Sequence, residues 1–106
     1  MSDRVIRDGR VAVLVSPGYG AGWSSWSDVS GLMFCPEIVA WVEAGKVGGK
    51  DAAEAIVKQV YPDVRVYCGG AEQLEVHWLA VGGQFRIEEY DGFESIAHGD
   101  SYWVTA

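Results

Sequence analysis

The pattern of hydrophobic and polar positions changes its period about two thirds of the way along this chain of 106 residues. In the first part, the run RVAVLVS (10–16) is continuously apolar after its arginine. Such a run is typical of a strand that is buried on both faces. Further on, in CPEIVAWVEAGK (35–46), Ile38, Trp41 and Val42 follow the i, i+3, i+4 spacing of one helical face. This segment therefore predicts an amphipathic helix.

The ends of the predicted helices carry their own signals. In the first helix, Pro36 suits the first helical position, and Gly45 suits the position just after the end. A second helix is predicted in GGKDAAEAIVKQVYP (48–62), where Asp51 and Glu54 match a D-x-x-E capping box. Its apolar face is formed by Ala53, Ile56, Val57 and Val60, and Pro62 ends it.

From Val64 onward the apolar positions alternate, as they do in strands with one buried face. Three segments follow this period of two: VRVYC (64–68), LEVHWLAV (74–81) and QFRIEEY (84–90). SYWVTA (101–106) can provide a short last strand. The pair Asp91-Gly92 stands directly after QFRIEEY, and Asp-Gly is a strong signal for a two-residue hairpin. We expect a hairpin at that position.

The element order β-α-α-β-β-β-β predicts a single α+β domain over residues 1–106. We expect a mixed, largely antiparallel sheet of four to six strands, with the two helices packed on one face. If the first strand pairs in parallel with a strand after the helices, that crossover should be right-handed.

Charge narrows the range of partners. The chain has 15 acidic and 8 basic residues, giving a net charge of −7, and residues 72–106 hold seven acids against Arg86 alone. Binding to nucleic-acid phosphates needs a basic surface, so the sequence argues against direct nucleic-acid binding. A protein or complex with a basic site is the expected partner.

The N-terminus MSDRVIRDGR is polar, and no apolar run approaches the roughly 18 residues of a membrane span. We expect a cytoplasmic protein that does not enter a membrane. Its two cysteines, Cys35 and Cys68, are expected to be free thiols, although their spacing also allows a disulfide.

The segment SPGYGAGWSSWS (16–27) combines glycines with three large aromatic residues, Tyr19, Trp23 and Trp26. Its glycines resemble a phosphate cradle, but it lacks the lysine of a Walker loop, and a turn-rich stretch follows it. The rings either complete the core or form a recognition surface, because tryptophan and tyrosine are the usual anchors of protein interfaces. Both interpretations stay open.

Catalytic and metal signatures are weak. Ser24, Ser25, Cys35 and Cys68 are the nucleophiles considered, and the only histidines are His77 and His98. His77 lies two residues from Glu75 on one strand face, without a nucleophile motif nearby. The chain has no C-x-x-C or H-x-x-x-H pair. We therefore predict no enzyme activity, no metal and no cofactor.

The segments VAVLVSPGYGAGWSSW, CPEIVAWVEAGK and FRIEEYDGFESI resemble small bacteriophage and prophage proteins of unassigned function. The resemblance spans most of the chain and supplies no active-site residues. It implies an accessory protein, since small acidic phage proteins often inhibit host machinery, including nucleic-acid-guided defence complexes with basic channels. A phage origin would place the protein in the cytoplasm of the bacterial host.

These observations lead to the hypothesis of a small, acidic, non-enzymatic binding protein that docks on or inhibits a host macromolecular complex. The anchors would be Tyr19, Trp23 and Trp26, and charge complementarity to a basic site would come from Glu88, Glu89, Asp91 and Glu94. The first alternative is a small-ligand binder that closes its glycine and aromatic loop over a nucleotide-like molecule. The second is a self-associating structural protein, for example a homodimer.

Overall fold

The computed structural model describes residues 4–18, 22–23, 31–63, 66, 68–90, 93–98 and 104–105. Its helices are α1 (Pro36–Glu43) and α2 (Gly49–Val60), with 3-10 turns η2 (Leu32–Phe34) and η3 (Ala71–Gln73). Its strands are β1 (Ile6–Arg7), β2 (Arg10–Val15), β3 (Glu75–Ala80), β4 (Gln84–Tyr90), β5 (Phe93–His98) and β6 (Val104–Thr105). This is an α+β fold, as the sequence predicts.

The strands form two small sheets instead of the single sheet expected. Sheet A has the order β1-β2-β3, and sheet B has the order β5-β4-β6. All described strand pairs are antiparallel, including β2 with β3, so the parallel crossover considered above is not formed between these strands. The chain leaves sheet A through a turn at 81–83, where Gly82 has a φ of 85° and the Gly83 N–H donates to the Ala80 carbonyl.

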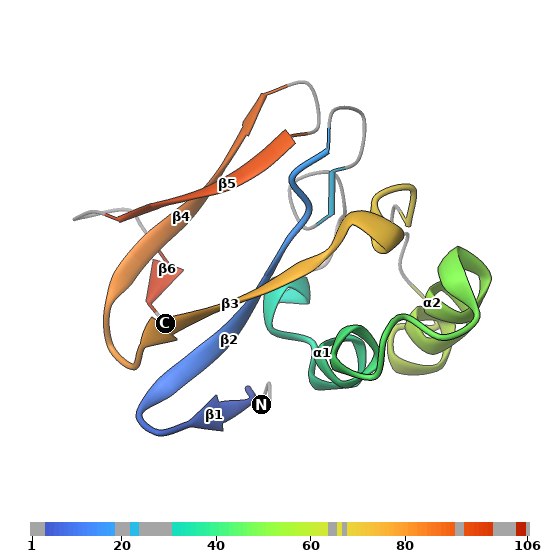
Figure 1. Ribbon diagram of the computed structural model, residues 1–106, viewed down its shortest axis with the longest axis horizontal. Helices are drawn as coiled ribbons and strands as arrows, with labels where there is room; N and C mark the ends of the chain where they lie inside the picture. The colour runs from blue at the N-terminus through green and yellow to red at the C-terminus, as the bar shows by residue number, and fades with distance from the viewer. Residues whose placement is uncertain are drawn as a thin grey trace.

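The two sheets and the helices are arranged in layers (Figure 1). Sheet A lies in the middle, with α1 and α2 on one side and sheet B on the other. The reason is visible in β2, whose residues Val11–Val15 are at most 2% exposed. A strand that is apolar on both faces needs a cover on each of them, and one sheet with helices on one face would leave the other face in water.

Each face of β2 belongs to a different apolar cluster. Ala12 and Leu14 pack in the cluster that contains the helix residues Ile38, Val39 and Val57. On the opposite face, three valines of β2 join Phe85 of sheet B and Phe34, whose rings meet edge to face with 6.1 Å between centroids. The prediction of a strand buried on both sides is confirmed.

The two helices are confirmed, but the capping box is wrong. α1 begins at Pro36, as predicted, while α2 begins at Gly49 and Asp51 lies within its first turn. The cap comes from a distant residue: the Glu72 carboxylate accepts a hydrogen bond from the Lys50 N–H at 3.1 Å. A Cβ at Gly49 would lie 2.6 Å from that carboxylate, and the φ of 64° also favours glycine.

Two hairpins are closed by Asp-Gly pairs. β4 and β5 pair from Tyr90↔Phe93 outward, which confirms the hairpin predicted around residues 91–92. A second hairpin joins β1 to β2 through Asp8-Gly9, both with positive φ, and the sequence analysis missed it. This is the same dipeptide signal, and it lies next to a strand of only two residues.

The strand predicted over 64–68 is not found in the part that the structure describes. Of this segment only Val66 and Cys68 are described, and neither belongs to a strand. β6 falls within the predicted segment 101–106 and pairs with the start of β4. Within the described ranges, no helix has both the length and the apolar character needed to cross a membrane.

Candidate functional site

The face of sheet B that is turned away from sheet A carries the candidate site. In β4, Phe85 and Ile87 pack toward the core, so the alternating residues Arg86, Glu88 and Tyr90 belong to the opposite face. The cross-strand partners of these three in β5 are Ala97, Ser95 and Phe93. We call this surface the outer face of sheet B.

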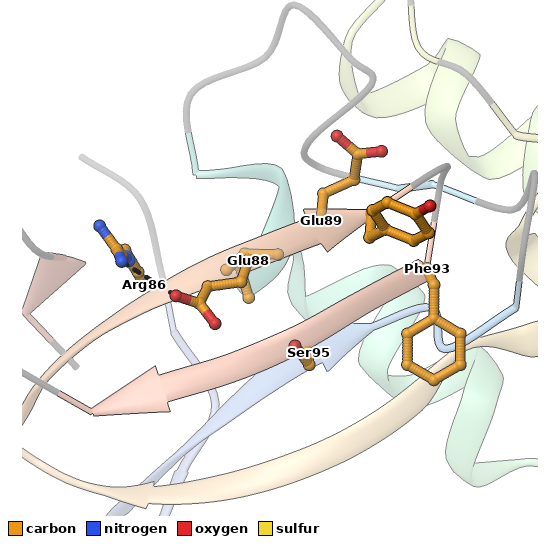
Figure 2. A pocket seen from close by; sticks show the side chains of 7 residues that line it. Arg86, Glu88, Glu89, Phe93 and Ser95 are labelled. Carbon is orange, nitrogen blue, oxygen red and sulfur yellow. Dashed lines mark hydrogen bonds and ion pairs between the residues drawn. The ribbon is translucent and has the colours of Figure 1, made fainter.

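The outer face contains an open hollow of about 520 Å³ near the β4–β5 turn (Figure 2). It is lined by Arg86, Ile87, Glu88, Glu89, Tyr90, Phe93 and Ser95. Arg86 donates from Nη2 to Glu88 Oε2 at 2.9 Å, and both side chains remain about half exposed. A hollow that holds a half-exposed ion pair can exchange that internal partner for an external cation.

Aromatic side chains stand at the end of this hollow. Tyr90 is 76% exposed, and its cross-strand partner Phe93 is partly buried. The two residues flank the Asp-Gly turn, which gives the tip of the hairpin an apolar surface beside its charges. Sequence reasoning did not select them, although the alternation that places Phe85 inward also places Tyr90 outward.

The predicted acidic residues do not form one patch. Glu88 lies on the outer face, whereas the neighbouring Glu89 side chain points away from it, as alternation along a strand requires (Figure 2). Both are exposed. Asp91 lies outside the described residues.

Glu94 is a correction to the sequence analysis, which expected it to offer its charge to a basic partner. Its side chain is 0% exposed. Glu94 Oε1 accepts from the Ser16 N–H at 3.1 Å and Oε2 accepts from the Trp23 N–H at 2.7 Å, while its own N–H donates to the Ser16 carbonyl at 2.9 Å. A buried carboxylate is tolerated where backbone donors solvate it, and this one joins β5 to the end of β2.

Trp23 is a second correction. It is 0% exposed and belongs to the cluster beneath the helices, so the expectation of an exposed anchor is wrong for this ring. The large apolar area of an indole favours burial, and its backbone is fixed by Glu94. Tyr19 and Trp26, the other two predicted anchors, lie outside the described residues.

Of the nucleophile candidates, Ser24 and Ser25 lie outside the described residues, and the two cysteines are poorly suited to catalysis. Cys35 and Cys68 are free and buried, and burial raises the pKa of both thiols, which disfavours the reactive thiolate. Burial together with Cys35 raises the pKa of Tyr61 to about 12. His77 and Glu75 form an exposed pair at 3.2 Å. Among the described residues, no group of three or more His, Cys, Asp and Glu is arranged to hold a metal ion.

A second hollow, of about 480 Å³, lies beside the β1–β2 hairpin. It is lined by Arg7, Asp8, Arg10, Glu43 and Trp78. Arg7 donates to both carboxylate oxygens of Glu43, at 2.7 and 2.9 Å, and its guanidinium lies 5.2 Å from the centre of the Trp78 ring. The charge and the ring are thus occupied by contacts within the protein.

Comparisons with known proteins add no relative to this picture. The chain matched no protein-family model, no curated protein and no solved structure. Residue roles therefore cannot be transferred from another protein. The outer face of sheet B, with its exposed aromatic and charged groups, is the candidate site on geometry alone.

Proposed function

We propose that this protein is a non-enzymatic binding protein that docks on a basic site of another macromolecule through the outer face of sheet B. The observation that carries the proposal is the open hollow in which Tyr90 and Phe93 stand beside Glu88. This surface replaces the aromatic loop of the sequence hypothesis, because Trp23 is buried.

The two kinds of residue supply different parts of binding. Aromatic anchors that are covered by a partner contribute most of the affinity, whereas charges mainly set the association rate and the orientation. Glu88 and Glu89 provide the negative charge near the hairpin tip, and the net charge of −7 extends the attraction to a positive surface. A basic partner therefore suits this face better than an acidic or neutral one.

The resemblance to small phage proteins makes a host complex the natural partner within this proposal. A host factor that works on nucleic acid has a basic channel, and an acidic domain docked there would compete with the nucleic acid. Self-association fits less well, since two copies that each carry −7 repel one another. A nucleotide-like ligand fits less well too, because the Trp23 ring is not available to stack on a base.

Capture from a bacterial lysate, followed by identification of the bound protein, tests the proposal with two matched variants. In the first variant, Glu88 and Glu89 are changed to lysine. In the second, Asp51 and Glu54 of α2 are changed to lysine, which alters the net charge equally on an exposed surface elsewhere. We expect the partner to be retained by the wild type and by the α2 variant, and lost by the hairpin variant.

The association rate of the captured partner should then fall with rising salt for the wild type, and should be slower at low salt for the hairpin variant. Equal loss of the partner in both variants would mean that net charge alone is responsible. Equal retention in both would remove the hairpin from the interface.

A further inference from the structure

β5 is the outer strand of sheet B. In the order β5-β4-β6, one of its edges pairs with β4 and the other faces away from the sheet. The pairing with β4 runs without interruption over the six residues of the strand, from Tyr90↔Phe93 to Phe85↔His98. The second edge is therefore free of bulges and as long as the strand.

The backbone groups on this second edge belong to alternate residues. The two-residue loop makes Tyr90 and Phe93 a hydrogen-bonded pair, so the N–H and C=O of Glu94, Ile96 and His98 point away from β4. The Glu94 N–H shows this direction, since it donates to Ser16 at 2.9 Å. Within the described residues, this bonding to a neighbouring segment stops at Glu94, and the edge continues through Ile96 and His98 without it.

Beyond the buried Glu94, the described part of this edge carries no residue that commonly protects against an added strand. Proteins commonly protect a sheet edge with lysine, proline or a bulge. The β5 sequence FESIAH contains neither residue, its register with β4 has no bulge, and its one acid, Glu94, is buried. Its outward-facing residues near the end, Ser95 and Ala97, are small and leave room above the edge.

The charge next to this edge indicates what it would accept. Glu88 is the cross-strand partner of Ser95 and lies on the same face. A residue on an added strand beside Ser95 would be two strand spacings from Glu88, about 10 Å between backbones. A lysine or arginine side chain can cross the small serine and reach the carboxylate, taking the position that Arg86 holds at 2.9 Å.

We infer that the outer edge of β5 accepts an extended segment of the partner as an additional strand of sheet B, with a lysine or arginine reaching over Ser95 to Glu88. The inference rests on the proposed function and specifies its binding mode. Main-chain hydrogen bonds to Ile96 and His98 hold the segment, and alternate side chains on the outer face give specificity.

The test uses a capped peptide of alternating arginine and threonine that is long enough to span β5. Two further forms of this peptide carry N-methyl groups on the backbone, one on its arginines and the other on its threonines. With arginine on the outer face, an antiparallel strand bonds to β5 through its threonine N–H groups, and a parallel strand through its arginine N–H groups. We expect one methylated form to bind at least about tenfold more weakly than the parent, and the other to bind equally well. The amide resonances of Ile96 and His98 should shift only with the forms that bind.

The outcomes separate the inference from the proposed function. If both methylated forms bind as tightly as the parent, the added strand is overturned while charge-driven docking stands. If none of the peptides binds, the inference is overturned and the lysate capture still decides the proposed function. A peptide with glutamine in place of arginine that binds equally well would support the added strand and contradict the basic partner.

A second copy of the chain is the other occupant to be tested. Sedimentation of the protein alone should give the mass of a monomer at concentrations at which the peptide binds. A dimer that the peptide disperses would place a second β5 on this edge, and would overturn the assignment to a basic partner.

Discussion

The β1–β2 and β4–β5 hairpins are closed by the same dipeptide, Asp-Gly, yet they use their charged residues in opposite ways. At the first hairpin, Arg7 is bound to both oxygens of Glu43 in α1 and lies over Trp78. At the second, Arg86 donates to Glu88, a residue of the same strand, and both side chains are about half exposed.

This difference separates charged residues that hold the fold together from charged residues that a partner can reach. The arginine of the first hairpin, Arg7, attaches that hairpin to the helix layer, so the charge of Arg7 has a structural role. The outer face of the second carries its charge beside exposed Tyr90, where a partner can reach it. The inner side of the second hairpin is structural again, because Glu94 is buried there.

The largest expected effect comes from Trp23, which the binding hypothesis treated as an exposed anchor. Trp23→Ala removes a fully buried indole and should lower the free energy of unfolding by about 3–5 kcal/mol, as large-to-small changes of aromatic core residues do. Urea unfolding followed by circular dichroism measures it. A loss below about 1 kcal/mol would contradict the burial of this ring.

Next in size is the buried side of the β4–β5 hairpin. Glu94→Gln removes the charge and replaces one carboxylate oxygen by an NH2 group, which is a donor facing the N–H donor of Ser16 or Trp23. The free energy of unfolding should therefore fall by about 2–4 kcal/mol. Glu89→Gln is the matched control, since Glu89 is the exposed cross-strand neighbour and its change should stay within about 0.5 kcal/mol. Equal effects of the two substitutions in the same urea titration would contradict the distinction between the buried Glu94 and the exposed Glu89.

A smaller effect compares the arginines of the two hairpins directly. Arg7→Ala should cost about 1 kcal/mol of unfolding free energy, because it breaks a bidentate pair that anchors β1 to α1 and removes packing on Trp78. Arg86→Ala should change stability by less than about 0.5 kcal/mol, since its ion pair with Glu88 is half exposed. Differential scanning calorimetry on both variants tests the order, and the reverse order would contradict the comparison.

The smallest effect concerns binding. Arg86→Gln releases Glu88 from its internal partner and makes the outer face more negative. The affinity for the arginine–threonine peptide should therefore rise by about two- to fivefold, in line with the modest energies of exposed ion pairs. Isothermal titration calorimetry measures the change, with Lys58→Gln on α2 as the control for net charge. A weaker affinity would make Arg86 part of the binding surface instead of a competitor.

Local patterns predicted most of the fold because each depended on neighbouring residues. The apolar run of β2, the spacing that defines α1 and the Asp-Gly signal of the β4–β5 hairpin are all confirmed. The features that were missed depend on residues far apart in the chain. The cap of α2 comes from Glu72, and the division into two sheets follows from the need to cover both faces of β2.

The candidate site was harder to predict for the same reason. Alternation along β4 separates Glu88 from Glu89, and that information was present in the sequence. The burial of Glu94 was not, since an acid in a strand normally indicates a solvated position. Its acceptors are satisfied by Ser16 and Trp23, which are 78 and 71 residues away in the chain.

The position of β2 within the layers has a consequence for the order of events during synthesis. Phe85 of sheet B, which covers one face of β2, follows Val15 at the end of that strand by 70 residues in the chain. One side of β2 therefore stays uncovered during synthesis until β4 has been made. A nascent chain halted before β4 would expose the apolar face of β2, to which chaperones can bind.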